Sequence, residues 1–264
     1  MPFFEAKFRN RMQQEIPVWM GRTRLLLGDE PIERLMKANV LVVGLGGVGG
    51  ICAEMIARAG VGRMSIVDAD TVEASNRNRQ APALVSTEDK LKSEVMAERI
   101  RDINPDIILK EFPIYMREEC TNEILLAEKY DYVVDCIDTL SPKVFLIKKC
   151  FEFGLPIVSS MGAGGKIDPT QVQVSSLWKS YNCNLASYVR KRLSQMGLKN
   201  RALTVVWSPE KADQSRIIPA PEGNPKRSLI GTISYMPAVF GCTMASVVIR
   251  ELMLNKPGML RGKK

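Results

Sequence analysis

The 264-residue sequence predicts an α/β fold in which a doubly wound, mainly parallel sheet is joined to a basic C-terminal lobe. Three observations support this prediction. Short β-branched runs alternate with helical patterns of about 10–15 residues, which is typical of parallel sheets. A glycine-rich turn follows the first run, and positive charge gathers in the last third of the chain. Apolar residues make up 45% and charged residues 25%, which excludes disordered, collagen-like and coiled-coil chains.

Five runs of β-branched and other apolar residues predict the strands of the sheet. Most of them end at glycine, proline or a carboxylate, which is typical of short, buried strands in a parallel sheet. In chain order they cover residues 39–43, 64–67, 107–112, 130–134 and 156–160.

Helical patterns lie between these runs. The pattern over 88–103 is long and amphipathic and is broken by an Asn-Pro pair. The others cover 48–59 and 142–153. The longest uncharged stretch, 229–249, contains too many glycines, prolines and hydroxyls for a membrane span. We therefore expect a loop that enters a buried helix near Pro237, and no membrane partner.

The positive charge is unevenly distributed. The chain has 37 basic and 29 acidic residues. Residues 1–168 hold 22 basic and 25 acidic side chains, a net charge of −3, whereas residues 169–264 hold 15 and 4, a net charge of +11. We therefore expect a core with N-terminal helices over 1–168, and a basic lobe over 169–264 that packs on this core.

The beginning of this lobe is free of acidic residues. No carboxylate occurs between Asp168 and Glu210, and aromatic residues are interleaved with the basic ones. The pattern fits either a solvated helix face or a surface that binds a polyanion, and composition leaves both open. The aromatic residues are Trp178, Tyr181, Tyr188 and Trp207, and the basic ones are Lys179, Arg190, Lys191, Arg192, Lys199 and Arg201.

The chain contains no histidine, which excludes several classes of site. A Ser-His-Asp or Cys-His nucleophile and a His-ligated zinc or iron site cannot form. Acid–base steps must therefore use carboxylates, Lys, Tyr or Cys. A reaction that depends on positioning and charge stabilisation, such as nucleotidyl transfer, is affected least.

Six cysteines occur without any C-x-x-C pair, so we expect a reduced, cytoplasmic protein without zinc. The charged N-terminus indicates no signal peptide. Four cysteines lie in apolar surroundings and are expected in the core. The four are Cys52, Cys136, Cys150 and Cys242. Cys183 lies in a polar run, where we expect a plain exposed thiol and a reactive thiol is the alternative.

The glycine-rich turn between the first strand and its helix is typical of nucleotide-binding sheets. Its glycines permit a tight turn and let phosphates approach the backbone at a helix N-terminus. Asp68 closes the second strand, where a carboxylate can accept hydrogen bonds from ribose hydroxyls. Taken alone, these features fit a nicotinamide dehydrogenase as well as an ATP site. The glycines are Gly44, Gly46, Gly47 and Gly49.

The polar residues that follow the turn favour ATP. An arginine and a lysine beside a phosphate-binding turn suit a triphosphate, and a carboxylate at the C-terminal end of a strand suits Mg²⁺. Nicotinamide chemistry needs none of these groups. In chain order the residues are Asp70, Asn76, Arg79, Gln80, Lys92 and the pair Asp135 and Asp138.

The order of these motifs resembles that of the ThiF/MoeB/ubiquitin-activating-enzyme-like superfamily of adenylating enzymes, over residues 22–165. The shared motifs are Gly-x-Gly-Gly-x-Gly, Asp-x-Asp, Asn-x-x-Arg-Gln, a following Lys and Asp-x-x-Asp. The resemblance implies a Rossmann-like ATP site in which Gly46 lies under the nucleotide and Asp68 holds the ribose. It also implies that Asp138 binds Mg²⁺ with ATP.

The same resemblance assigns the catalytic groups. It implies that Asn76, Arg79 and Lys92 face the phosphates. Arg24 matches an arginine that reaches into the site of the neighbouring subunit, so a homodimer is expected. Such an arginine can act as a finger in phosphoryl transfer. The candidate catalytic residues are therefore Arg24, Arg79, Lys92 and Asp138.

One branch of this superfamily, the tRNA threonylcarbamoyladenosine dehydratases, is similar to the chain nearly end to end. The similarity lies in Met161-Gly-Ala-Gly-Gly-Lys-Ile-Asp168 and in the basic segment that begins at Leu185. It implies ATP-dependent activation of the threonyl carboxylate on a modified adenosine beside the anticodon, followed by ring closure and net loss of water. It makes tRNA the expected polyanion and leaves a bound monovalent cation open.

Three other functions stay open on the sequence. The same motifs would adenylate the C-terminal Gly-Gly of a ubiquitin-like sulfur carrier, although the missing zinc cysteines and the basic lobe disfavour this. A nucleotide-binding scaffold without activity is disfavoured by the presence of Arg79, Lys92 and Asp138. A nicotinamide dehydrogenase is disfavoured by the polar residues after the glycine turn.

Overall fold

A parallel sheet organises the chain in the computed structural model, which describes residues 15–213, 215, 217–220 and 228–255. The charged N-terminal segment on which the absence of a signal peptide was predicted lies outside these residues. The strands are β1 (Asn39–Val43), β2 (Arg63–Val67), β3 (Ile108–Phe112), β4 (Tyr132–Asp135), β5 (Ile157–Ser160), β6 (Gln173–Ser176), β7 (Thr204–Trp207), β8 (Ile217–Pro219) and β9 (Ser228–Ile230).

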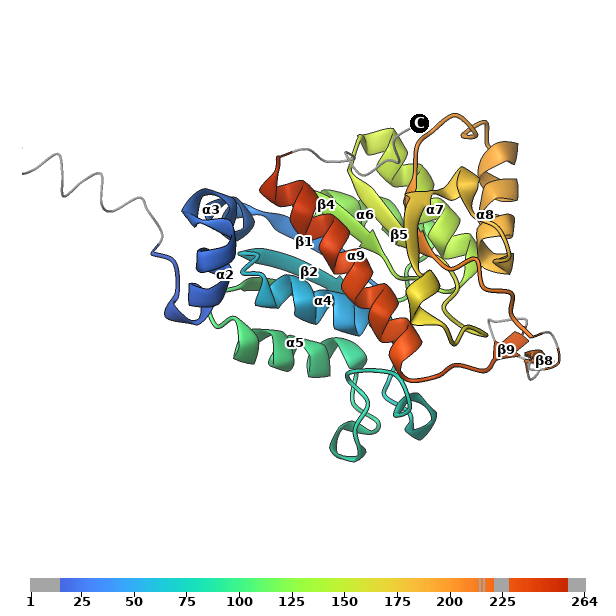
Figure 1. Ribbon diagram of the computed structural model, residues 1–264, viewed down its shortest axis with the longest axis horizontal. Helices are drawn as coiled ribbons and strands as arrows, with labels where there is room; N and C mark the ends of the chain where they lie inside the picture. The colour runs from blue at the N-terminus through green and yellow to red at the C-terminus, as the bar shows by residue number, and fades with distance from the viewer. Residues whose placement is uncertain (1–14, 214, 216, 221–227, 256–264) are drawn as a thin grey trace, which may run out of the picture.

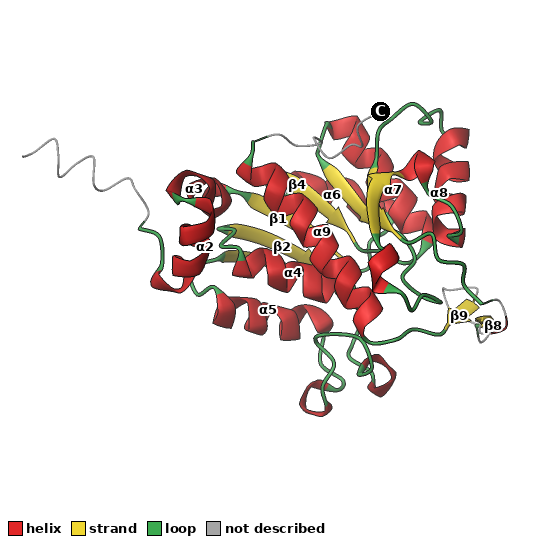
Figure 2. Cartoon of the chain, viewed as in Figure 1, coloured by secondary structure: helices red, strands yellow, loops and turns green. Residues whose placement is uncertain are grey.

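Seven of these strands form the main sheet, in the order β3-β2-β1-β4-β5-β7-β6 (Figure 1). β6 pairs with β7 in antiparallel fashion, and all other neighbours in this sheet are parallel. This confirms the predicted doubly wound, mainly parallel sheet. β8 and β9 form a separate antiparallel pair beside it (Figure 2).

Helices cover both faces of the sheet, and each face has its own hydrophobic core. Buried residues of α4, α5 and α9 belong to one core and those of α6, α7 and α8 to the other. The helices are α2 (Gly21–Leu27), α3 (Asp29–Lys37), α4 (Gly49–Arg58), α5 (Lys92–Ile103), α6 (Glu118–Leu126), α7 (Leu140–Phe153), α8 (Asn184–Gln195) and α9 (Tyr235–Met253). Short 3₁₀ turns are η1 (Val18–Met20), η2 (Ala74–Asn76), η3 (Val85–Thr87), η4 (Pro169–Gln171) and η5 (Leu177–Lys179).

β1 is the centre of this arrangement. All five of its residues are buried, because Val40 and Val42 point into one core while Leu41 and Val43 point into the other. It pairs with β2 on one side and with β4 on the other. The strand order therefore reverses beside β1, and the loops that leave the carboxyl ends of β1 and β4 diverge there. Ligands of doubly wound sheets bind at this point.

α9 is the buried helix that the uncharged stretch predicted. It begins at Tyr235, and buried residues such as Phe240 and Met244 pack against α4 and the sheet. Within the described residues it is the one helix long and apolar enough to cross a membrane, with a mean hydropathy of 1.3, and half of that window is buried inside the protein.

The start of α5 differs from the prediction. The helix was expected from residue 88 but begins at Lys92. Residues 90–92 instead pair with the segment after β2: Val72 N–H donates to Lys90 O at 2.9 Å, and Lys92 N–H donates to Asp70 O at 2.9 Å. The positive φ of 65° at Asp89 turns the chain before this pairing. A backbone contact between segments distant in sequence has thus replaced the first helical turn.

The C-terminal part continues the same sheet. β7 adds to β5 and β6 adds to β7, while α9 crosses back to pack on α4. The described residues after Asp168 therefore share both cores with the residues before it. The division of the chain at Asp168 into two lobes of different net charge stays a prediction.

The cysteines match the prediction only in part. All six are free thiols. Cys52 and Cys150 are buried as expected, and burial raises the pKa of both thiols. Cys242 was expected in the core but is exposed on α9, while Cys183, expected to be exposed, is buried. Cys183 packs near Gly162, where the loop after β5 covers it.

Candidate functional site

The glycine turn joins β1 to α4 and is tight enough to require glycine. Gly44 has a φ of 88°, and a Cβ at Gly49 would lie 1.7 Å from the carbonyl oxygen of Gly44. At Gly47 a Cβ would lie 2.9 Å from Pro237 of α9. Gly46 differs, since its nearest neighbour would be Gln80 at 4.0 Å. The turn is therefore closed on the protein side and has space at Gly46.

Asp68 is fixed against this turn. One of its carboxylate oxygens accepts a hydrogen bond from Leu45 N–H at 2.6 Å and the other from Asp70 N–H at 2.8 Å. Burial raises the pKa of Asp68, and the two backbone hydrogen bonds and the charge of Lys92 oppose that shift. The predicted ribose ligand thus lies at the carboxyl end of β2, beside the glycine turn.

Lys92 and Asp70 form an ion pair next to Asp68. Lys92 Nζ lies 2.9 Å from Asp70 Oδ2, and the pairing of residues 70–72 with 90–92 holds the two side chains together. Tyr115 lies in the loop after β3, and the negative charge of Asp70 raises the pKa of the tyrosine. The structure therefore brings two predicted ATP residues into direct contact.

The loop from η2 carries three further predicted residues. Arg79 is half-buried and donates to Ser75 O at 3.1 Å and to Asn78 Oδ1 at 2.8 Å. Asn76 Oδ1 and Gln80 Oε1 are buried and have no hydrogen-bond partner among the described residues, and neither does Ser93 Oγ at the start of α5. Unpaired buried acceptors are costly, so a ligand with hydrogen-bond donors would suit this edge.

Asp135 and Asp138, after β4, have different environments. Asp138 is exposed. Asp135 is fully buried, and its oxygens accept from Lys143 Nζ at 2.7 Å, from Ser159 Oγ at 2.6 Å and from Ile137 N–H at 3.1 Å. Of the two, Asp138 is therefore the residue whose side chain reaches the surface. The assignment of Asp138 as the magnesium residue stays a prediction.

Arg24 lies far from the glycine turn of its own chain. It is on α2 and forms a two-point ion pair with Asp29, both N–O distances being 2.6 Å. The length of helix α9 indicates the distance between Arg24 and the glycine turn. Pro237, near the start of α9, lies beside the glycine turn, whereas Met253 O, at its end, accepts a hydrogen bond from Arg34 on α3. Sixteen helical steps correspond to about 24 Å. Figure 1 likewise places α2 and α3 at the end of the sheet where β1 begins.

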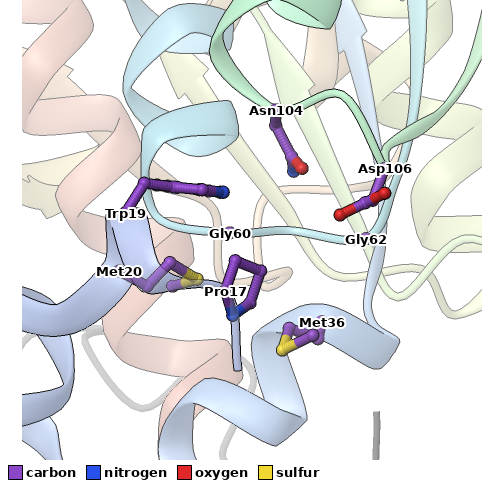
Figure 3. A pocket seen from close by; sticks show the side chains of 8 residues that line it. All are labelled: Pro17, Trp19, Met20, Met36, Gly60, Gly62, Asn104 and Asp106. Carbon is purple, nitrogen blue, oxygen red and sulfur yellow. The ribbon is translucent and has the colours of Figure 1, made fainter. Parts of the chain in front are cut away.

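A small pocket at that same amino-terminal edge lies away from the glycine turn (Figure 3). Met20 fills part of it and comes so close to Gly60 that a Cβ there would lie 2.4 Å from the methionine. The lining is mainly apolar and backbone, so it offers no catalytic cluster. Its residues are Pro17, Trp19, Met20, Met36, Gly60, Gly62, Asn104 and Asp106.

The six predicted tRNA-binding residues fall into two groups. Arg190 donates to Ser180 O at 2.7 Å, and Arg201 donates to Phe151 O at 2.8 Å and lies 5.2 Å from the centre of the Phe151 ring. These two guanidinium groups brace the protein itself. Arg201 is exposed in spite of these contacts, and the remaining four residues, which are also exposed, are Lys179, Lys191, Arg192 and Lys199.

The aromatic residues of the basic stretch also divide. Trp178 donates to Arg201 O at 3.0 Å, and Trp207 is buried, with its Nε1 donating to Ser175 Oγ at 2.8 Å. Tyr181 is 55% exposed and rests edge to face on Trp207, the ring centres being 5.0 Å apart. Tyr181 is thus a rigidly supported ring that faces solvent.

Three charged residues near the carboxyl edge of the sheet were not recognised as structural from the sequence: Lys143, Lys166 and Glu210. Lys143 and Lys166 are buried, the second donating to Asn182 O at 3.1 Å and to Glu210 O, and burial lowers the pKa of Lys166. The Glu210 carboxylate accepts from Ile167 N–H at 3.0 Å. The sequence does carry a signal for Lys143, because it is a charged residue within the apolar pattern of a helix.

The comparisons with known proteins identify the family of the chain. The model of the ThiF family matches residues 20–263. A tRNA threonylcarbamoyladenosine dehydratase of Bacillus subtilis is 36% identical, over 88% of this chain and 94% of that protein. The crystal structure of the Escherichia coli tRNA N6-threonylcarbamoyladenosine dehydratase in complex with ATP is 33% identical, covers 89% of this chain and 94% of that one, and has a TM-score of 0.80.

Relatives of a second kind match a smaller part. An adenylyltransferase and sulfurtransferase of Vanderwaltozyma polyspora is 33% identical over 62% of this chain and 38% of that protein. The similarity to the dehydratases is therefore the more extensive, and it includes the basic C-terminal part. The chain belongs to the ThiF family and, within it, to the branch of the tRNA threonylcarbamoyladenosine dehydratases.

Proposed function

We propose that the protein is an ATP-dependent tRNA threonylcarbamoyladenosine dehydratase. One observation carries this proposal: Asp68, Asp70 and Lys92 are in contact with one another or with the glycine turn, in a chain that aligns with a dehydratase over 88% of its length. Adenylation of the C-terminal Gly-Gly of a sulfur carrier is not favoured, because the relatives named as sulfurtransferases match a smaller part of the chain.

The glycine turn and Asp68 would bind the nucleotide. The start of α4 attracts phosphate, since it lies at the positive end of the helix dipole. The space at Gly46 admits the nucleotide, and Asp68 is fixed where a ribose would lie. The unpaired oxygens of Asn76 and Gln80 would accept from the ribose hydroxyls or the adenine amino group, which are the hydrogen-bond donors of ATP.

Arg79 and Lys92 supply positive charge beside the phosphates, and Asp138 supplies an exposed carboxylate after β4. Within the described residues no group of three or more Asp, Glu or Cys side chains could hold a metal by itself. This suits Mg²⁺, which is usually bound by one or two carboxylates together with the phosphates of the substrate. When bound, Mg²⁺ would neutralise charge that develops on the α-phosphate. A monovalent cation is not needed for this assignment.

The reaction needs no histidine and no cysteine nucleophile. A carboxylate oxygen of the threonyl group attacks the α-phosphorus, and pyrophosphate leaves. A nucleophilic atom of the carbamoyl group then attacks the activated carbonyl carbon, and AMP leaves with the carboxylate oxygen while a proton is released. The modified adenosine has then lost the elements of water. Ring closure within one molecule is favoured by proximity, so the enzyme mainly has to position the groups.

The exposed cations on and around α8 would bind the tRNA backbone. Lys179, Lys191, Arg192 and Lys199 form no ion pair among the described residues, which suits a phosphate partner. Tyr181, held by Trp207, could stack on an unpaired base of the anticodon loop. This role supports the division into an ATP-binding core over 1–168 and a tRNA-binding lobe over 169–264. A tRNA substrate and six free thiols support a cytoplasmic location.

We also propose a homodimer. Arg24 lies at the opposite edge of the sheet from its own glycine turn, so only a second copy could bring it to a phosphate. Large apolar side chains are exposed around it: Val18 (97%), Leu25 (90%) and Leu26 (81%). Such a surface favours burial against another chain.

Exchange of labelled pyrophosphate into ATP tests the proposal. We expect exchange that requires tRNA bearing threonylcarbamoyladenosine. Exchange stimulated instead by a ubiquitin-like protein with a C-terminal Gly-Gly, and not by the modified tRNA, would replace the dehydratase assignment with that of a carrier-activating enzyme.

A further inference from the structure

Lys143 forms a buried ion pair directly behind the loop that carries Asp138. Its Nζ lies 2.7 Å from Asp135 Oδ2, and neither side chain has any exposed surface. The lysine comes from α7 and the aspartate from the end of β4. The pair therefore joins a helix to the carboxyl edge of the sheet, inside the protein.

Lys143 holds a third element as well. Its ammonium donates to Ser159 Oγ at 3.0 Å and to Ser160 O at 2.9 Å, both on β5. Ser159 Oγ in turn donates to Asp135 at 2.6 Å. One ammonium thus fixes the ends of two adjacent strands at the edge where the nucleotide site lies.

Asp135 transmits this constraint to the turn that follows β4. Its second oxygen accepts from Ile137 N–H at 3.1 Å, and Ile137 immediately precedes Asp138. Cys136, between them, donates through its N–H to Val43 O at 2.9 Å. The carbonyl oxygen of Cys136 is so close to Gly44 that a Cβ there would lie 3.0 Å from it. The turn is therefore clamped between Asp135 and the glycine turn.

A fully buried ion pair is by itself weak evidence for a contribution to stability. Removing two charges from water costs several kcal/mol per ion, and an apolar pair of similar volume is often equally stable or more so. Here the hydrogen-bond partners of the pair named above belong to the two strand ends and to the turn. The pair therefore fixes the positions of these segments, although an apolar pair of similar volume would fill the same space without the cost of burying two charges.

We propose that Lys143 is a positioning residue for the reaction: through Asp135 it holds the turn 136–138 so that the Asp138 carboxylate faces the phosphates of ATP. This rests on the proposed function only in that Asp138 takes part in binding ATP with Mg²⁺. Lys143 itself does not touch substrate.

The variants must separate positioning from folding. Lys143→Met alone leaves Asp135 buried and unpaired, which can prevent folding. The informative variant is therefore the double replacement Asp135→Leu with Lys143→Met, which removes both charges and also the acceptor of Ile137 N–H. Lys149→Met is the matched control, because Lys149 lies on the same helix and pairs with Glu152 at the surface.

Two measurements on the full chain decide the question. Hydrogen exchange of the segment 136–140 is compared among the variants without nucleotide, and ATP affinity is measured by calorimetry at trace and at saturating Mg²⁺. For the folded double variant we expect faster exchange in this segment, and a gain in ATP affinity from Mg²⁺ about tenfold smaller than in the unchanged protein. The control should match the unchanged protein in both.

Unchanged exchange, or faster exchange with an unchanged magnesium effect, would overturn the proposal and leave the pair as an element of the core. Failure of the double variant to fold, with the control stable, would also overturn it, because the pair would then be required for stability itself. Neither measurement uses tRNA, so a wrong substrate assignment would not change the outcome.

Discussion

Lys92 and Asp70 form an ion pair of 2.9 Å in which the lysine side chain is 6% exposed and the aspartate side chain 50%. The strand-like pairing of residues 70–72 with 90–92 sets this contact. Asp68 lies beside the same pair, and the positive charge of Lys92 opposes the rise in the pKa of Asp68 that burial causes. A phosphate that approaches the ammonium must therefore compete with Asp70, and the ribose ligand and the phosphate ligand are parts of one cluster.

Replacing Lys92 by methionine should reduce ATP–pyrophosphate exchange about 10²-fold, the usual effect of losing one group that stabilises developing charge. The melting temperature should change little, because Asp70 is half-exposed and is solvated when left alone. Lys90→Met is the control, since Lys90 is exposed two residues away. Exchange within about threefold of the unchanged protein would contradict the role of Lys92.

Two glycines of the turn should respond differently to alanine. At Gly49 the new Cβ would lie 1.7 Å from Gly44 O, so we expect Gly49→Ala to lose about 3 kcal/mol or more of unfolding free energy. At Gly46 there is space, so Gly46→Ala should fold normally and bind ATP more weakly. Thermal unfolding and calorimetry measure the two effects. Normal ATP affinity of Gly46→Ala would remove this glycine from the site.

The cations of the basic lobe that lack a protein partner among the described residues and the one that is braced by Phe151 should also differ. Each phosphate that a variant no longer neutralises lowers the slope of log affinity against log salt by about 0.7–0.9. The double variant Lys191→Gln with Arg192→Gln should therefore reduce the slope for tRNA by about 1.4–1.8. Arg201→Gln should instead reduce stability, because Arg201 holds Phe151, and leave the slope unchanged. Equal slopes for all three proteins would exclude α8 from the tRNA surface.

Tyr181 should contribute to tRNA affinity without changing its salt dependence. A base stacked on an aromatic ring is worth about 1–3 kcal/mol, so Tyr181→Ala should weaken binding at least about fivefold. Tyr181→Phe keeps the ring on Trp207 and should bind normally. The measurement is a salt titration of binding for both variants. Normal affinity of Tyr181→Ala would show that the ring does not stack on tRNA.

Arg24 should act only on the site of the other subunit. Arg24→Ala should lose about 10³-fold of the exchange activity, as for other arginine fingers, and Asp138→Asn should also be nearly inactive. Mixing the two variants with subunit exchange creates dimers with one intact site, so about a quarter of the activity should return. Arg22→Ala serves as the control on the same helix. No recovery on mixing would contradict the shared site.

The strands β1 to β5 could be predicted from the sequence because apolar, β-branched runs leave a strong local pattern, as in β1, whereas β6 to β9 were not predicted. The first turn of α5 could not, because its residues pair with the distant segment at Asp70. The glycine turn and Asp68 were recognised from spacing. That Arg190 and Arg201 brace backbone carbonyls depends on tertiary contacts that charge counting cannot reveal. The same holds for Lys143, whose partners come from two strands.

Mass spectrometry of tRNA nucleosides tests the central claim most directly. tRNA bearing threonylcarbamoyladenosine is incubated with the protein, ATP and Mg²⁺, and is then digested under conditions that preserve the cyclic product. We expect a nucleoside lighter than threonylcarbamoyladenosine by the mass of one water, formed only with ATP and absent with Asp138→Asn. An unchanged nucleoside, with active protein that binds both ATP and the tRNA, would contradict the assignment of this chain as a dehydratase.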